Sequence, residues 1–284
     1  MDAYVFPGQG SQFKGMGQGL FDQVEEFSRI EREVDALMGY SIRKRCLEDP
    51  GNRLKETQFT QPCLFTVNAL HYFKAVREGI NPKYFAGHSL GEYNALLAAG
   101  VFDFMTGLRI VKRRAELTGA VREGGMAAVV GLGEGQIKEV LQKENCSSID
   151  FANLNTPLQI VISGPTSDIE RLQKPIEQAG ASMYIPLPVS AAFHSRYMAD
   201  AALEFEPFLE QFPFSAPHVP VISNVTGQPY PSEGGAAVRK LLVKQITHPV
   251  QWVQTVRLLR ANGVTKFCEL GAGTLLTRLI SQIK

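Results

Sequence analysis

The segment AGHSLGEY, residues 86–93, constrains the fold of this chain more than any other. Gly87 and Gly91 lie two positions either side of Ser89, a short apolar run precedes them, and a helical pattern follows. A G-x-S-x-G between a strand and a helix is typical of the nucleophile elbow, a sharp turn that exposes a serine hydroxyl. The alternative is an ordinary flexible loop, since so short a pattern also arises by chance. The strand before and the helix after it favour the elbow.

Strands and helices alternate on both sides of this turn. The expected elements are strands at 3–7, 83–87, 219–225 and 265–270, and helices at 20–38, 62–79, 104–119, 196–210, 235–245 and 251–261. Alternation of this kind is typical of a parallel sheet that helices cover on both faces. We therefore predict an α/β fold whose large part is α/β-hydrolase-like.

The pattern changes near Gly124 and Gly125. From here the expected order is a strand at 126–132, a helix at 134–144, paired strands at 148–153 and 158–164, a helix at 167–180 and a strand at 182–189. The order βαββαβ is that of a ferredoxin-like unit. We therefore expect a ferredoxin-like subdomain, 124–192, inserted into a catalytic subdomain made of 1–123 and 193–284.

Charge and composition argue against several classes of protein. Lys plus Arg (29) nearly balances Asp plus Glu (28), and no basic stripe is present, so we expect no nucleic-acid partner. No apolar run approaches the ~18 residues of a membrane span. The four cysteines form no C-x-x-C pair and no histidines cluster, which predicts no metal site and no disulfide framework. The first residues lack the pattern of a signal peptide, so we expect a cytoplasmic protein.

A serine nucleophile needs a base, and the chain has five histidines. His194, in VSAAFHSRYM, lies in a loop just after the predicted inserted unit, where a cleft between two subdomains would be. His88 adjoins Ser89, but neighbouring residues on a sharp elbow point in different directions, so we expect a structural role for it. The order Ser…His fits elbow-type enzymes. No aspartate stands out as the group that orients the base.

The glycine-rich loop FPGQGSQFKGMG, 6–17, raises the possibility of dinucleotide binding. That fingerprint needs G-x-G-x-x-G directly after a strand. Phe13 occupies the third glycine position here, and Pro7 interrupts the step from strand to turn. We therefore expect the loop to offer a backbone N–H to an oxyanion hole beside the elbow instead.

With these residues in view, the chain closely resembles the malonyl-CoA:acyl carrier protein transacylases over nearly its whole length. The motifs that carry the resemblance appear in order: FPGQGSQ, GHSLGEY, IVKRRAEL, GGMAAVVGL, NLNTPLQIVISG, VSAAFHSRYM, KQITHPVQW and ELGAG. The resemblance implies that Ser89 attacks the thioester of malonyl-CoA and carries the malonyl group as an ester. His194 would act as the base, oriented by the main-chain carbonyl of Gln245 rather than by a carboxylate.

The resemblance also implies roles for residues around the serine. The backbone N–H groups of Gln9 and Leu90 would form the oxyanion hole. Arg114 would hold the malonyl carboxylate, because its planar fork suits a bidentate grip that lysine cannot reproduce. Without the resemblance, Arg114 would read as one more solvated residue of the KRR run.

Three further residues are expected in the substrate pocket: Phe193, His88 and Asn155. Phe193 before His194 is similar to the A-F-H type associated with malonyl rather than methylmalonyl selection. A bulky ring there would crowd an α-methyl group, although discrimination at this scale is usually only about 1–3 kcal/mol.

The stretches ISNVTGQPY and HPVQW are more similar to acyltransferases of polyketide synthases than to those of fatty acid synthesis. We therefore expect a discrete enzyme that acts in trans on an acyl carrier protein or on carrier domains of a polyketide synthase. The alternatives are a housekeeping malonyltransferase of fatty acid synthesis and a hydrolase that clears acyl groups from carrier proteins. No cofactor is expected, since malonyl-CoA is a substrate and the phosphopantetheine belongs to the partner. We expect a monomer.

Overall fold

Four parallel strands form the sheet that leads into the serine turn. The computed structural model describes residues 1–284, and the order across this sheet is β7 (Val221–Ile222), β2 (Tyr84–Gly87), β1 (Asp2–Phe6) and β8 (Lys266–Glu269). Parallel pairing sets Phe6 opposite Gly87, so the loops that follow β1 and β2 leave the same edge of the sheet. A crevice outside the carboxyl ends of parallel strands is where such folds bind ligands.

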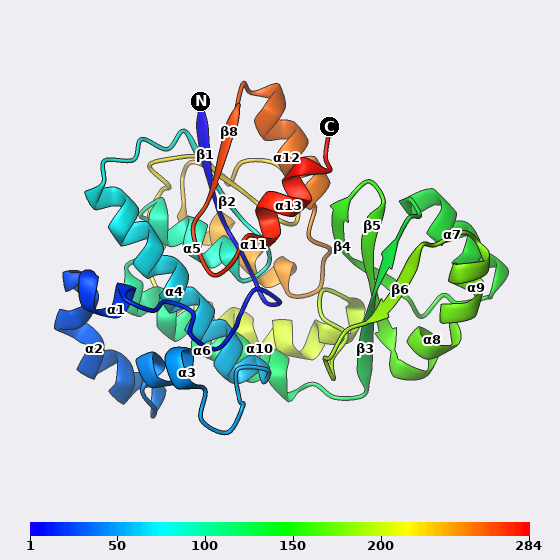
Figure 1. The fold of residues 1–284 in the computed structure, drawn as a ribbon, viewed down its shortest axis with the longest axis horizontal. Helices are drawn as coiled ribbons and strands as arrows, with labels where there is room; N and C mark the ends of the chain where they lie inside the picture. Colours follow the sequence, from blue (N-terminus) through cyan, green and yellow to red (C-terminus); the bar gives the residue numbers. More distant parts are fainter.

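Helices cover both faces of this sheet, as the alternating pattern predicts (Figure 1). Tyr4 and Phe6 of β1 enter a core of 46 buried residues, and Ala3 and Val5 enter a second core of 13 on the opposite face. The helices are α1 (Leu20–Gln23), α2 (Glu25–Met38), α3 (Ile42–Glu48), α4 (Thr57–Arg77), α5 (Gly91–Ala98), α6 (Phe104–Ala120), α10 (Ala199–Leu209), α11 (Gly235–Gln245), α12 (Trp252–Ala261) and α13 (Leu275–Ser281), with a 3₁₀ turn at Arg196–Met198.

A second, antiparallel sheet lies on the right of Figure 1. Its strands are β3 (Gly124–Val130), β4 (Asp150–Thr156), β5 (Gln159–Pro165) and β6 (Met183–Pro186), in the spatial order β4-β5-β3-β6. The helices α7 (Glu134–Lys143), α8 (Thr166–Arg171) and α9 (Gln173–Gln178) pack with these strands around a core of 14 buried residues. This is the βαββαβ order of a ferredoxin-like unit, so the predicted fold class is confirmed.

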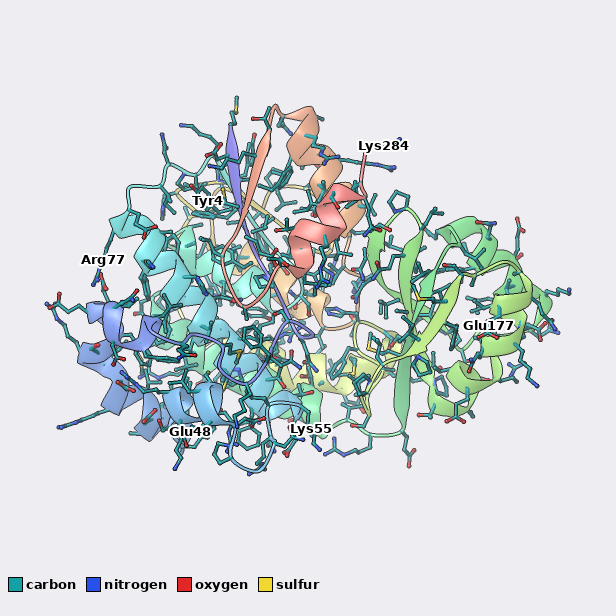
Figure 2. The ribbon with its side chains drawn as sticks, in the orientation of Figure 1. Tyr4, Glu48, Lys55, Arg77, Glu177 and Lys284 are labelled. Carbon is teal, nitrogen blue, oxygen red and sulfur yellow. The ribbon has the colours of Figure 1, made fainter.

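Strand β4 links the antiparallel sheet to the large subdomain. The backbone of Leu154 donates to the Val250 carbonyl at 2.9 Å, and Val250 donates in turn to the Ala152 carbonyl at 2.8 Å. This short parallel bridge ties the edge of the antiparallel sheet to the segment before α12. The outer ends of the two parts lie far apart, with Arg77 and Glu177 at opposite sides of the molecule (Figure 2). The exact boundaries proposed for the two subdomains remain a prediction.

Some elements differ from the sequence-based expectation. The single helix expected over 167–180 is two helices, because Pro175 has no N–H to donate to the Arg171 carbonyl. The helix expected over 20–38 breaks at Val24, whose backbone is extended and whose side chain is fully buried. The strand expected over 219–225 forms only two residues, after which the chain leaves the sheet toward the serine turn. The helix α3 was not expected.

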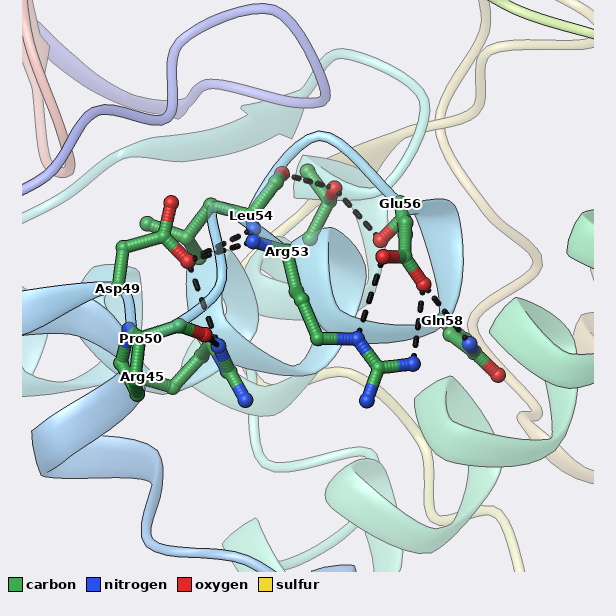
Figure 3. A network of polar contacts seen from close by, with 8 residues as sticks. Arg45, Asp49, Pro50, Arg53, Leu54, Glu56 and Gln58 are labelled. Atoms are coloured by element: carbon green, nitrogen blue, oxygen red, sulfur yellow. Dashed lines mark hydrogen bonds and ion pairs between the residues drawn. The ribbon is translucent and has the colours of Figure 1, made fainter.

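The loop between α3 and α4 is ordered by a local polar network (Figure 3). Asp49 Oδ1 accepts from the backbone N–H groups of Arg53 at 2.8 Å and Leu54 at 3.0 Å. The Arg53 guanidinium pairs with Glu56, the N-cap residue of α4. The network therefore fixes the start of α4, the helix that carries Gln61 into the site described below. None of the helices is both long enough and apolar enough to cross a membrane.

Candidate active site

Ser89 occupies the turn between β2 and α5. Its φ is 50°, in the left-handed region that few residues other than glycine adopt. Asn224 holds the turn: its Oδ1 accepts from the Ser89 N–H at 2.7 Å, and its Nδ2 donates to the Gly87 carbonyl at 2.6 Å. Strained backbone persists only where surrounding contacts determine it, and it is common at functional sites. The sharp turn predicted from the sequence is present.

The glycines around Ser89 are required by close backbone contacts. A Cβ on Gly87 would lie 1.9 Å from the carbonyl carbon of Gly91, and one on Gly91 would lie 2.0 Å from the Phe6 oxygen. Gly8, in the loop after β1, is equally confined, since a Cβ there would meet the His88 oxygen at 2.2 Å. No side chain fits at these distances. The glycine pattern therefore has a steric cause, and it brings the first loop against the serine turn.

His194 contacts the serine hydroxyl. Its Nε2 lies 2.7 Å from Ser89 Oγ, and its Nδ1 lies 2.9 Å from the main-chain oxygen of Gln245 and 3.1 Å from that of His248. Carbonyl oxygens only accept hydrogen bonds, so Nδ1 carries the ring proton and Nε2 is free to accept the proton of Ser89. No carboxylate takes part in this arrangement. His194 has a φ of 57°, so both partners of the Ser–His pair have left-handed backbones.

The electrostatic surroundings keep His194 neutral. Burial lowers its pKa to about 3, and the nearby Arg114 charge acts in the same direction. The hydrogen bonds from Nδ1 to the two carbonyls oppose this shift but do not cancel it. A neutral imidazole at pH 7 is the form that can accept a proton. His194 therefore has both the tautomer and the charge state of a general base.

Arg114, on α6, is a buried guanidinium without an ion-pair partner. It donates to Gln61 Oε1 at 2.8 Å, to Gln245 Oε1 at 3.1 Å and to Ser89 Oγ at 3.3 Å. Its charge also lies over the ring of Tyr93, 5.4 Å from the centroid. A buried charge is costly unless it is paired. The guanidinium is therefore suited to an anionic group placed beside the serine.

Gln9 and Leu90 flank the serine with free backbone donors. Gly8 lies so close to the turn that a Cβ there would be 3.5 Å from the Leu90 nitrogen. Neither the Gln9 nor the Leu90 N–H donates to another group of the protein. Leu90 directly precedes α5, whose N-terminus carries partial positive charge. The two N–H groups can therefore stabilise negative charge on an oxygen next to Ser89.

Gln9, Ser89, Arg114 and His194 line a common cavity of about 100 Å³. Both subdomains contribute to its wall. It is lined by Gln9, Gln61, His88, Ser89, Arg114, Thr118, Met126, Asn153, Leu187, Val189, Phe193, His194 and Ile246. Its size suits a short acyl group.

The three expected pocket residues differ in their placement. Phe193 and His88 line the cavity, whereas Asn155 does not and reaches it only through His88. His88 Nε2 lies 2.8 Å from Asn155 Oδ1, and its ring packs edge-on against Trp252 with centroids 5.6 Å apart. Burial lowers the pKa of His88. This neutral ring is a fixed part of the wall and makes no hydrogen bond to the serine hydroxyl.

Several residues of the site were missed by sequence reasoning. The His248 carbonyl, Asn224 and Gln61 each contact a residue of the Ser–His–Arg group, yet none lies in a pattern that signals this. Gln245 was expected to contribute a carbonyl, but its side chain also contacts Arg114. Glu92 lies within GHSLGEY itself. Its burial, shared by every residue of helix α5, is seen only in the structure.

Residues 3–283 match the acyl transferase domain family, and the chain belongs to that family. It is 50% identical to the polyketide biosynthesis malonyl CoA-acyl carrier protein transacylase PksC of Bacillus subtilis, over 100% of this chain and 97% of that protein. It is 51% identical to the polyketide biosynthesis protein ThaF of Burkholderia thailandensis, over 100% of this chain but only 24% of that much longer protein.

A solved structure with the same fold shows a type II PKS acyl-carrier protein in complex with its malonyl-transacylase. This chain superposes on it with a TM-score of 0.93 and 34% sequence identity, covering 99% of this chain and 92% of that one. The likeness extends through both sheets, so the two-subdomain architecture is that of the malonyl transacylases.

Proposed function

We propose that this protein transfers a malonyl group from malonyl-CoA to the phosphopantetheine thiol of an acyl carrier protein, through an ester on Ser89. The observation that carries the proposal is the buried, unpaired guanidinium of Arg114 at 3.3 Å from Ser89 Oγ. A serine hydrolase of neutral acyl chains has no use for such a charge. A malonyl ester on Ser89 would place its free carboxylate there.

The first half of the reaction forms the ester. His194 Nε2 takes the hydroxyl proton as Ser89 Oγ attacks the thioester carbonyl, and the negative oxygen accepts from the N–H groups of Gln9 and Leu90. When the C–S bond breaks, the imidazolium returns that proton to the leaving sulfur, so CoA departs as a thiol. The carbonyls of Gln245 and His248 hold the ring in place and stabilise its positive charge in the intermediate.

The second half reverses these steps with another thiol. His194 takes the proton of the phosphopantetheine thiol, whose sulfur attacks the Ser89 ester, and then returns the proton to Ser89 Oγ. Water competes for the same ester, and the small cavity between the two subdomains limits its access. Arg114 grips the malonyl carboxylate with two parallel hydrogen bonds, and Phe193 bounds the space next to the α-carbon.

We further propose that the acceptor is a carrier protein of polyketide biosynthesis, reached in trans. The relatives at about half identity, PksC and ThaF, are both named for polyketide biosynthesis, which supports this choice over a housekeeping role in fatty acid synthesis. The solved complex of a malonyl-transacylase with its carrier protein supports docking between separate chains. A monomer in a reducing compartment is also proposed, and all four cysteines are free, in keeping with this.

Intact-mass spectrometry with a panel of acyl-CoAs tests the function. Malonyl-CoA should add one malonyl group to the wild-type protein and none to Ser89→Ala. The loaded enzyme should then pass the group to isolated carrier proteins, faster to those of polyketide synthases than to a fatty acid carrier protein. A malonyl adduct that still forms on Ser89→Ala would overturn the assignment of the nucleophile. Release of free malonate without transfer to any carrier would favour a hydrolase.

A further inference from the structure

Glu92 is a buried carboxyl group beneath the serine turn. It lies in the first turn of α5, three residues after Ser89, with none of its surface exposed, and it forms no ion pair. A buried carboxylate is costly unless hydrogen bonds satisfy both oxygens. Nothing in the transfer reaction described above uses this group.

Each oxygen of Glu92 accepts from a different part of the chain. Oε1 accepts from the backbone N–H of Asn224 and from the hydroxyl of Tyr230, both at 2.8 Å. Oε2 accepts from Nε2 of Gln245. Each oxygen faces one N–H group, which can only donate, so the carboxylate accepts on both sides, as its ionised form requires.

The Gln245 side chain links this carboxylate to the arginine. Its Nε2 donates to Glu92 and to the Ser89 carbonyl, the latter at 2.9 Å, and its Oε1 accepts from Arg114 at 3.1 Å. Glu92 and the Ser89 carbonyl can only accept, so they force the amide nitrogen toward themselves. The amide oxygen must then face Arg114.

We propose that Glu92 is a positioning residue for malonyl recognition: through the amide of Gln245 it fixes the Arg114 guanidinium for the substrate's carboxylate. Because Glu92 does not contact Arg114 directly, it orients the guanidinium and leaves its outer N–H groups for the substrate. This inference rests on the proposed function, since it gives a role to a residue behind the proposed carboxylate clamp.

Opposing effects of the surroundings determine the pKa of Glu92. Burial raises its pKa to about 7, while the three donors and the charge of Arg114 favour the ionised form. The other titratable groups that face it are the hydroxyls of Tyr230 and Tyr93, and burial raises the pKa of both. Measurements at pH 8.5 therefore examine the carboxylate rather than the acid.

Glu92→Gln is the informative variant, because the two oxygens have different partners. An amide at this position keeps its oxygen toward Asn224 and Tyr230, which leaves its NH2 facing Nε2 of Gln245. Two donors cannot bond, so the Gln245 amide must turn over or lose its partner. If the amide turns over, Arg114 loses its acceptor. If it only loses its partner, the Ser89 carbonyl alone holds it, and the acceptor for Arg114 is no longer fixed by Glu92. The support of the serine turn by Asn224 is kept.

The measurement is the ratio of second-order rate constants for loading Ser89 with malonyl-CoA and with acetyl-CoA, at pH 8.5. Acetyl lacks the free carboxylate of the malonyl group, so a purely structural defect lowers both rates and leaves the ratio unchanged. We expect Glu92→Gln to lower the ratio about tenfold, the effect of one charge-assisted hydrogen-bond arrangement. An unchanged or increased ratio would overturn the proposal, an increase indicating that Glu92 competes with the substrate for Arg114.

Gln245→Met tests the same link from the other side. It removes the amide and leaves the main-chain carbonyl that accepts from His194. We expect a similar loss of the ratio, and no further loss in the double variant Glu92→Gln/Gln245→Met, because both changes break one link. Multiplied losses would show that the two residues act separately. Gln245→Met carries the test alone if Glu92→Gln fails to fold, and a ratio unchanged by it would refute the proposal.

Tyr230→Phe is the matched control. It removes one donor to Oε1 but keeps both the carboxylate and its bond to Gln245. The ratio should stay within about twofold of wild type, since a neutral hydrogen bond on the far oxygen does not orient Gln245. A tenfold loss here would show that any damage to the buried network has the same effect. Failure of the wild-type protein to load malonyl at all would instead refute the proposed function.

Discussion

His194 Nε2 and Ser89 Oγ lie 2.7 Å apart although 105 residues separate them in the chain. The inserted antiparallel sheet occupies most of that interval, so folding of the small subdomain returns the chain to the serine. The imidazole of His194 therefore reaches the serine hydroxyl from a loop at the junction of the two subdomains. Its neutral charge state follows from burial at that junction.

The pH dependence of acylation should reflect the low pKa of His194. Its value of about 3 means that the ring stays neutral down to pH 5.5, whereas an ordinary histidine of pKa about 6.5 would be about tenfold depleted in its neutral form at that pH. We therefore expect the rate constant for loading with acetyl-CoA to change less than about threefold between pH 8 and 5.5. Acetyl-CoA is used because it has no free carboxylate, so titration of Glu92 cannot change the rate through carboxylate binding. A tenfold decline with a midpoint near 6.5 would contradict this expectation, and His194→Ala should lose about 10²–10⁴-fold at every pH.

Arg114 should determine the choice between malonyl and acetyl groups. Arg114→Ala removes the buried charge, so we expect malonyl loading to fall by at least about 100-fold while acetyl loading persists or rises. Arg114→Lys should recover only a small part of the malonyl rate, because an ammonium group cannot form the bidentate pair. Rates of loading measured by intact mass provide the comparison.

Arg113, the residue before Arg114 in the same helix, offers a matched control. Its side chain is partly exposed and pairs with Glu116 and Glu204 at the surface. Arg113→Ala should leave both loading rates within about twofold of wild type, since surface ion pairs contribute little. A malonyl-specific loss in Arg113→Ala would mean that the general positive charge of this helix, and not the Arg114 fork, attracts the substrate.

Gly91 should not tolerate any side chain. A Cβ there would lie 2.0 Å from the Phe6 oxygen and 2.9 Å from the Pro7 oxygen, so Gly91→Ala must displace the backbone of β1 or of the serine turn. We expect a loss of at least about 3 kcal/mol in the free energy of unfolding, measured by urea denaturation. Gly135→Ala is the control, because that glycine lies in helix α7 with nothing near its Cβ. The free energy of unfolding of Gly135→Ala should rise by about 0.5–1 kcal/mol. Similar losses of stability in both variants would rule out the steric explanation.

Glu92 should make the protein less stable as the pH rises. Its pKa in the folded protein, about 7, lies above the ordinary value of 4.5, so the folded state holds the proton more tightly. Its stabilising contribution is complete below pH 4.5 and is lost as the pH rises through 7, by about 3 kcal/mol. Wild type minus Glu92→Gln should show this decline in denaturation at pH 5 and pH 8.5. His194 acts in the opposite direction, since its contribution is lost as the pH falls from 6.5 toward 3, but it is common to both proteins and cancels.

The sequence predicted the parts of the site that depend on local pattern. The turn at Ser89 is recognised from Gly87 and Gly91, which flank it between a strand and a helix that adjoin in the chain. The contacts that require these glycines are partly long-range, since a Cβ on Gly91 would meet the Phe6 oxygen. The βαββαβ order is likewise local, because each element is defined by its own periodicity. His194 could be selected because its loop follows that unit. Each of these features can be recognised within a short segment of the sequence.

Residues that act through backbone atoms or through burial could not be found in this way. The carbonyls of Gln245 and His248 are chemically the same as those of every other residue, so no local pattern distinguishes them. The failure to find an orienting aspartate has this explanation. The family resemblance alone pointed to Gln245, and nothing pointed to His248. Arg114 reads as one of three adjacent basic residues until the fold buries it beside the serine. Asn155, expected in the pocket, lies behind His88 instead, because β4 pairs with the segment at Val250 and holds it there.

The sequence by itself thus determined the class of fold and led to the proposal of Ser89 as nucleophile and His194 as base, since these inferences depend on steric and periodic patterns within short segments. The tertiary structure alone decided the charge states and the polar links. Burial among groups that are remote in the chain determines three properties: the neutral state of His194, the lack of an ion-pair partner for Arg114 and the ionisation of Glu92. A pKa or an oriented amide depends on the surrounding dielectric and on partners in space, and neither is a property of sequence order.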